Sequence, residues 1–221
     1  MASLCRRSWF LASLAIKIVA IGFSVASFAA ENASTFVRLQ FGNDVSIEVP
    51  RNWKFLDQNM REHLNTYSEA IVKFSGININ QGNNQILVAA NAYTTGKKPS
   101  ATMRLSVRVG SFPSQSEIES ADQGELRHGA ELSLHLLQDS LPDRVKSMKL
   151  LDVRREKLGG YYTIVTDKKV DYDSGESLDR LDVIYLGSRV YKLNTSYRKS
   201  DAWLFEPMIR HIRQSLRVTA K

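Results

Sequence analysis

A run of strict alternation constrains the fold of this 221-residue chain more than any other feature. From residue 101 to residue 109 an apolar side chain occupies every second position, and all four positions between are polar or charged. The apolar set is Ala101, Met103, Leu105, Val107 and Val109, and it alternates with Thr102, Arg104, Ser106 and Arg108. Because successive side chains of a strand point to opposite faces, this period of two predicts a strand with one buried and one wetter face.

The segment before this strand predicts its first neighbour in a sheet. Ile86–Thr95 has the composition of a strand, and Gly96-Lys97-Lys98-Pro99 has that of a turn. Strands that follow each other through a tight turn pair in antiparallel order. We therefore expect an antiparallel sheet.

Upstream of these strands the sequence predicts a hairpin and a helix. Phe36–Phe41 and Val45–Val49 are short strand-like runs joined by a three-residue turn that contains glycine. Asp57 is expected to cap a helix that ends at Gly76. Apolar residues recur there every three or four positions, as on one face of a helix: Met60, Leu64, Tyr67, Ile71 and Phe74.

Downstream, the sequence predicts helical segments, then a run of strands, then a last helix. Ser114 or Ser116 caps the first segment, Gly124 breaks it, and Pro142 stops the stripe that follows. That stripe consists of Leu126, Ala130, Leu134, Leu137 and Leu141. The four predicted strands are Leu151–Leu158, Tyr161–Val170, Leu178–Leu186 and Arg189–Tyr197. Pro207 is placed in the first turn of the final helix. Runs of strands interrupted by isolated helices predict the α+β class.

This order of elements, with four local phrases, resembles the PsbP-like superfamily. The phrases are VSIEVPRNW (Val45–Trp53), KLGGYYTIVT (Lys157–Thr166), RVYKLNTSYR (Arg189–Arg198) and MIRHIRQSLRV (Met208–Val218). The resemblance is closest to bacterial periplasmic and envelope members of unknown role. It implies a three-layer α/β/α sandwich around an antiparallel sheet, and a non-enzymatic tendency. It brings no functional motif, so no site residue is transferred from it.

The N-terminal segment has the pattern of a secretory signal. An apolar stretch runs from Trp9 to Ala30, and the only charged residues of the segment are Arg6, Arg7 and Lys17. Ser27 and Ala29 have the small side chains that a signal peptidase requires before its cleavage point. We expect a signal peptide of residues 1–29 to be removed, which leaves residues 30–221 as a single domain.

An uncleaved membrane anchor is the alternative for this segment. The stretch is just long enough to cross a bilayer. Lys17 would then lie near its middle, which costs about 2.5–3.5 kcal/mol on insertion scales. The pair Arg6-Arg7 leaves the twin-arginine route open beside the general export route. Either route predicts a periplasmic or secreted protein, in contact with a membrane only if the segment is retained.

The cysteine count and the net charge exclude several kinds of site and partner. Cys5 is the sole cysteine and lies in the segment expected to be removed, so the mature chain would hold no disulfide, thiol nucleophile or thiolate metal site. Loss of three basic residues with that segment lowers the net charge from +7 to +4. This mild surplus comes with no cluster of basic and aromatic residues. We expect no nucleic-acid partner.

Three groups of residues were weighed as candidate sites. His128 and His135 would share a helix face but lie two turns, about 10 Å, apart, which is too far to bind one metal ion as a pair. The carboxylates of Asp171–Asp179 suit a hard cation, but their spacing is not that of a calcium loop, so the segment is interpreted as a polar hairpin turn. The aromatic residues interpreted as core rather than as a ligand groove are Trp53, Trp203, Tyr161 and Tyr162.

The sequence therefore assigns no catalytic, cofactor-binding or metal-ligating residue, and no cofactor is expected. The leading hypothesis is a non-catalytic binding or assembly module whose partner is an envelope protein or a small ligand. The alternative is an envelope hydrolase whose catalytic set is dispersed along the chain. Titratable groups gathered in a deep pocket would favour the hydrolase, and a flat or apolar groove would favour the binding module.

The exported protein is expected to begin at or near Ala30, because the small residues at positions 27 and 29 direct cleavage after the second of them. Mass spectrometry of the protein recovered from a bacterial envelope fraction measures this directly. A full-length product that stays with the membrane would contradict the prediction.

Overall fold

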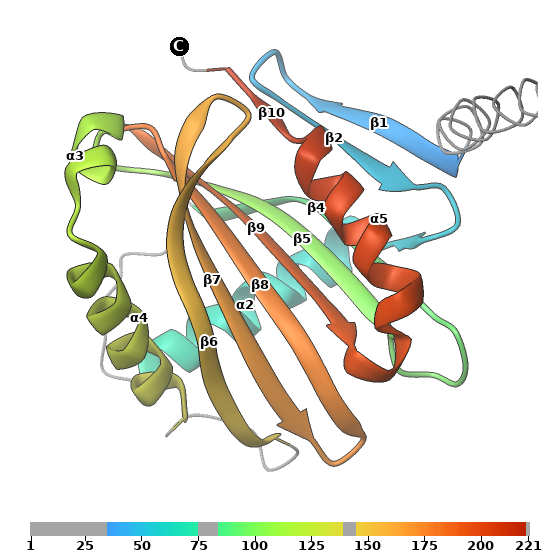
Figure 1. The fold of residues 1–221 in the computed structure, drawn as a ribbon. Coiled ribbons are helices and arrows are strands. Elements are labelled where there is room, and N and C mark those ends of the chain that lie inside the picture. Colours follow the sequence, from blue (N-terminus) through green and yellow to red (C-terminus); the bar gives the residue numbers. More distant parts are fainter. Residues whose placement is uncertain (1–34, 75–83, 139–144, 220–221) are drawn as a thin grey trace, which may run out of the picture. The chain divides into compact units, whose positions relative to one another are not determined.

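A twisted antiparallel sheet organises the chain after residue 36 (Figure 1). The computed structural model describes residues 35–74, 84–138 and 145–219. The chain divides into two units, residues 1–36 and 37–221, and the architecture below is that of the second. Its described residues form a seven-stranded sheet in the order β3-β4-β5-β9-β8-β7-β6. These strands are β3 (Lys54–Phe55), β4 (Asn84–Ala92), β5 (Ala101–Val109), β6 (Val145–Leu158), β7 (Tyr161–Tyr172), β8 (Gly175–Tyr185) and β9 (Arg189–Arg198).

The predicted alternation is confirmed in β5, which lies inside the sheet between β4 and β9. Ala101, Met103 and Leu105 are at most 1% exposed, whereas Val109, the last residue of the predicted buried set, is 50% exposed at the end of the strand. Thr102 and Arg104, on the opposite face, are only half-buried. The two faces of the sheet therefore have different surroundings.

The four strands predicted for the second half form a meander of antiparallel neighbours, β6 to β9. Gly159 and Gly160 make the β6–β7 turn with φ of 61° and 93°, a backbone region that favours glycine. β7 and β8 continue through Tyr172 and Gly175, which pair directly, so the turn between them is two residues long. The Asp171–Asp179 segment is thus a hairpin, as predicted.

Helices cover both faces of the sheet, as Figure 1 shows. The helices are α2 (Gln58–Phe74), α3 (Gln115–Ser120), α4 (Gln123–Gln138) and α5 (Ala202–Ser215). Successive residues of β6 reach opposite layers: Glu156 pairs with Arg213 of α5, and Arg155 donates to the carbonyls of Ile118 and Ala121 at the end of α3. The α/β/α layering that the resemblance implied is present.

The predicted caps of two helices are confirmed. The carboxylate of Asp57 accepts a hydrogen bond of 2.8 Å from the backbone N–H of Met60 at the start of α2. Ser114 and Glu117 form a capping box at the start of α3. Met60 itself is 48% exposed, so the first residue of the predicted apolar stripe does not join the core. Predicted features at Gly76, Leu141 and Pro142 lie outside the described residues.

Two predictions about helix boundaries were wrong. Gly124 does not separate the helices; the break lies at Ala121 and Asp122, whose carboxylate accepts from the N–H groups of Gly124 and Glu125 and so caps α4. Pro207 is the sixth residue of α5 rather than part of its first turn, because a short 3₁₀ turn, Lys199–Asp201, starts the helix earlier. Pro207 is exposed and, having no N–H, leaves one hydrogen bond of the helix unformed.

The predicted hairpin is confirmed: its strands are β1 (Phe36–Phe41) and β2 (Val45–Pro50). These strands lie outside the seven-stranded sheet. They form a three-stranded sheet with β10 (Arg217–Val218), which pairs with β2 in antiparallel order. Glu48 of β2 ties this sheet to α5: its backbone N–H donates to Ser215 Oγ at 2.8 Å, and its Oε2 lies 2.6 Å from His211 Nε2.

The aromatic residues behave differently from one another. Trp53 is 3% exposed and meets Phe205 of α5 edge-to-face, with ring centroids 6.2 Å apart. Trp203 is 79% exposed, so its assignment to the core was wrong: it points away from the sheet at the start of α5. Tyr161 and Tyr162 are half-buried. Only Trp53 is a full member of the core among these four.

Replacing Trp53 by Ala should lower the free energy of unfolding by about 3–5 kcal/mol, because a buried indole and its contact with Phe205 are lost. Trp203→Ala is the matched control and should change it by less than about 0.5 kcal/mol. Denaturant unfolding of both variants measures the difference. Equal stability of the two variants would contradict the burial of Trp53.

A charged cluster links the sheet to α5. Nε of Arg213 donates to Asp182 Oδ1 at 2.7 Å, and its guanidinium also contacts Glu156. Asp182 is 1% exposed. Burial raises the pKa of Asp182 to about 7 and lowers the pKa of Arg213 to about 10. Asp167 lies in the same cluster; burial opposes its ionisation, but hydrogen bonds from Arg180 and Arg154 bring its pKa below the ordinary value.

The raised pKa of Asp182 predicts a pH-dependent stability. Between about pH 4 and 7 the folded state retains a proton that the unfolded state has released, so the contribution of Asp182 to stability falls as pH rises. Asp182→Asn removes that fall. As pH rises through this window, the free energy of unfolding of the variant should therefore increase relative to that of the wild type by up to about 1.4 kcal/mol per pH unit. Denaturant unfolding at several pH values measures the gain.

Asp167→Asn is the matched control for this pH series. The lowered pKa of Asp167 places its titration below the window. The free energy of unfolding of this variant should therefore differ from that of the wild type by a constant amount between pH 4 and 7. If the free energy of unfolding of Asp182→Asn instead falls relative to that of the wild type as pH rises, Arg213 keeps the buried carboxylate ionised.

Candidate ligand-binding site

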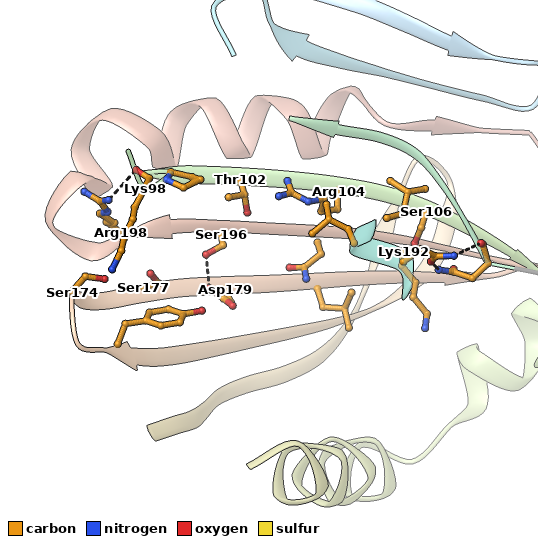
Figure 2. A pocket seen from close by; sticks show the side chains of 18 of the residues that line it. Lys98, Thr102, Arg104, Ser106, Ser174, Ser177, Asp179, Lys192, Ser196 and Arg198 are labelled. Carbon is orange, nitrogen blue, oxygen red and sulfur yellow. Dashed lines mark hydrogen bonds between the residues drawn. The ribbon is translucent and has the colours of Figure 1, made fainter. Parts of the chain in front are cut away.

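A cavity of about 670 Å³ lies against the face of the large sheet opposite α5. Its base consists of side chains of β5, β9 and β8, and residues of α2, β4 and two turns complete its wall. Figure 2 shows the polar side chains that line it, which extend along the strands. This sheet-face cavity is lined by Leu64, Asn65, Asn84, Ile86, Lys98, Pro99, Thr102, Arg104, Ser106, Arg108, Tyr172–Gly175, Ser177, Asp179, Leu181, Lys192, Asn194, Ser196 and Arg198.

The base of the cavity follows from the register between β5 and β9. Nine consecutive residue pairs join these strands without a shift. Thr102 pairs with Ser196, Arg104 with Asn194, and Ser106 with Lys192, and all six of these residues line the cavity. The face that was predicted to be wetter is therefore the face that carries the site.

Positive charge dominates the lining. Among the described residues that line the cavity, two carboxylates, Asp173 and Asp179, accompany five basic side chains. The basic residues are Lys98, Arg104, Arg108, Lys192 and Arg198. An excess of cations on a concave surface attracts an anion and raises its local concentration.

The guanidinium of Arg104 is held in place by the backbone. It donates to the carbonyls of Ala90 and Met103 at 3.1 and 2.8 Å, and to the side-chain oxygen of Asn91 at 2.9 Å. Burial lowers the pKa of Arg104. A charged group fixed in advance loses little conformational freedom when a ligand binds.

Lys192 and Arg108 form the second basic group. Burial, followed by the nearby charge of Arg108, lowers the pKa of Lys192. The guanidinium of Arg108 lies 5.6 Å from the centre of the Phe112 ring, a cation–π arrangement that positions it. Two cations close together in a partly desolvated place repel each other, and an anion between them would relieve that repulsion.

Arg198 and Lys98 form the third basic group, at the other end of the strands. The Arg198 guanidinium donates to the Lys98 carbonyl at 3.1 Å, and its backbone N–H donates to the Ser100 carbonyl at 2.9 Å. Figure 2 places this pair far from Lys192, with Ser196 and Asp179 between them.

Asp179 is the carboxylate inside the cavity. Ser196 Oγ donates to its Oδ1 at 2.5 Å. Burial raises the pKa of Asp179, although the bond from Ser196 and the charge of Lys168 act in the opposite direction. This pair offers an acceptor to a ligand hydroxyl or amine amid the cations.

The structure disperses the carboxylates of the Asp171–Asp179 segment. Asp173 pairs with Lys146 at 3.4 Å, and Glu176 is bonded by Lys169 and Lys199, which lower its pKa to about 2. In the described part of the chain, no three His, Cys, Asp or Glu side chains converge as metal ligands would. His128 and His135 are both exposed on α4.

The basic residues of the site were not predicted from the sequence. Arg104 and Arg108 were visible as the polar positions of the alternating strand, but a polar face alone does not indicate a site. Their partners on β9 lie about ninety residues further along the chain, and only the β5–β9 pairing brings them together.

None of the helices in the described segments has the length and apolar character needed to cross a membrane.

Comparisons with known proteins identify the fold. No protein-family model and no curated protein matches the chain in sequence. The solution structure of cyanobacterial PsbP (CyanoP) from Synechocystis sp. PCC 6803 matches with a TM-score of 0.52 at 10% identity, over 84% of this chain and 93% of that one. The chain thus has a PsbP-like fold, as its sequence indicated.

Two other solved structures are less similar. LpqN of Mycobacterium tuberculosis, described as involved in cell envelope biogenesis, matches at 15% identity over 83% of this chain and 90% of that one, with a TM-score of 0.46. PA94 of Pseudomonas aeruginosa, a protein of unknown function, matches at 13% identity over 84% and 99%, with a TM-score of 0.42.

Proposed function

We propose that this protein is an exported envelope module that binds an anionic ligand in its sheet-face cavity. The observation that carries this proposal is the excess of five basic side chains over two carboxylates along one concave face of the sheet. The location in the envelope is supported by the signal pattern of the N-terminal segment, with its basic residues and its apolar stretch.

The arrangement of the cations supports binding. Charged groups are costly to bury unless they have partners, and charge-assisted hydrogen bonds to an anion are about twice as strong as neutral ones. Arg104 is fixed by three hydrogen bonds, while Lys192 and Arg108 repel each other at the base of the cavity. An anion that enters the cavity therefore meets cationic side chains that are already in place to bind it.

One observation favours the alternative of an envelope hydrolase. The cavity is polar rather than flat or apolar, and Ser196 donates a proton in a hydrogen bond to a carboxylate whose pKa is raised by burial. A serine beside a base is one element of covalent catalysis. A hydrolase would cleave the ligand that it binds.

Binding of anions to the mature protein provides the test, with citrate and a galacturonate hexamer as probes in isothermal titration calorimetry. At least one probe should bind, and Arg108→Gln with Lys192→Gln should raise its dissociation constant about tenfold or more. Loss of charge-assisted bonds worth about 1.5–3 kcal/mol gives that factor.

Two adjacent lysines provide a matched control for this experiment. Lys98 lines the cavity, and its neighbour Lys97 is exposed and does not. Lys98→Gln should weaken binding, whereas Lys97→Gln should not, although both remove one charge. Equal effects of the two, or no binding of either anion, would refute the proposal. Release of shorter galacturonates during the titration, detected by mass spectrometry, would favour the hydrolase.

A further inference from the structure

We infer that the ligand is a linear, hydroxyl-rich polyanion, an acidic polysaccharide that lies along β5 and β9. This inference rests on the proposed function and adds the class of ligand. It follows from three features of the cavity: the length over which its cations are distributed, the neutral polar groups between them, and the position of one carboxylate.

The cations extend along the strands instead of gathering at one point. Arg198 lies level with Ser100 of the neighbouring strand, to which it is hydrogen-bonded, and Arg108 lies eight residues further along. Eight residues of an antiparallel strand span about 27 Å. A compact anion can contact only one of the basic groups at a time. A chain with several negative charges can contact all of them.

The middle of the cavity carries hydroxyl and amide groups. Thr102 pairs with Ser196, and Asn194 is the partner of Arg104, so these neutral groups lie between the two basic ends. Hydroxyl and amide side chains can both donate and accept hydrogen bonds. They match the hydroxyl groups of a sugar ring, which also donate and accept.

Asp179 favours a ligand whose units can present a hydroxyl group to it. It lies among the cations, beside Ser196, where it would repel a negative group of the ligand placed against it (Figure 2). It can accept a hydrogen bond from a ligand hydroxyl. The position of Asp179 therefore favours a polyanion rich in hydroxyls over a polyphosphate or a nucleic acid.

A length series tests the extended binding mode, with galacturonate, its dimer, its tetramer and its hexamer as probes. The hexamer should bind at least about tenfold more tightly than the dimer, because contacts at the second basic end become intramolecular once the first end is bound. Maltohexaose, which has hydroxyls but no charge, is the control and should bind more weakly than the galacturonate hexamer.

Single variants at the two ends separate a chain from a compact ligand. Arg198→Gln and Lys192→Gln should each weaken binding of the hexamer about tenfold, and Lys97→Gln should leave it unchanged. Unchanged melting curves check that the variants are folded. If only one of these two variants weakens binding of the hexamer, or if galacturonate and citrate bind as tightly as the hexamer, the inference of an extended ligand is wrong. The proposal of an anion-binding site is then unaffected. If no anion binds, the proposed function itself fails.

The role of Asp179 has its own readout, the ratio of two affinities. Asp179→Asn should increase the affinity for hexathymidylate relative to that for the galacturonate hexamer about tenfold, since a repulsion is removed and a hydroxyl acceptor is weakened. Tighter binding of hexathymidylate than of the hexamer by the wild type would identify a nucleic acid as the ligand and overturn the inference. A ratio that Asp179→Asn leaves unchanged would show that Asp179 does not discriminate between the two ligands and would overturn this selectivity.

Discussion

The pairing of β5 with β9 is the interaction on which both the core and the site depend. Its nine consecutive pairs place Met103, Leu105 and Leu193 on one face, each at most 1% exposed, and Arg104 and Lys192 on the other. Because the side-chain period of a strand is two, a slip of one residue would exchange the faces and bury the cations. The apolar face therefore sets the register, and the register sets the geometry of the cavity.

The two faces of the sheet differ in the balance of their acidic and basic side chains. On the side of α5, acids and bases are paired: Asp167 accepts from Arg180 and Arg154, and Asp182 accepts from Arg213. On the cavity side the basic groups exceed the carboxylates. Buried ion pairs contribute little net stability but are costly to break. The ion pairs on the first face therefore hold α5 against the sheet. The second face carries an unbalanced charge that a ligand can neutralise.

Features governed by neighbouring residues could be predicted from the sequence. The alternation of β5, the capping box at Ser114 and the glycine turn at Gly159-Gly160 depend on residues a few positions apart. The burial of Trp53 was also predicted correctly. The same approach failed at Trp203, because its exposure depends on how α5 is rotated against the sheet, and helical spacing does not set that rotation.

The sequence by itself determined the α+β class, the antiparallel order of the strands and the polar character of one face of β5, since each follows from local periodicity and turn chemistry. Only the tertiary structure decided that this face would be a binding surface. Arg104 and its partner Asn194 on the neighbouring strand are far apart in the sequence, and a contact over that distance depends on which strands pair and in which register. Such pairing is a collective result of burying the apolar face, so no local pattern at either residue records it.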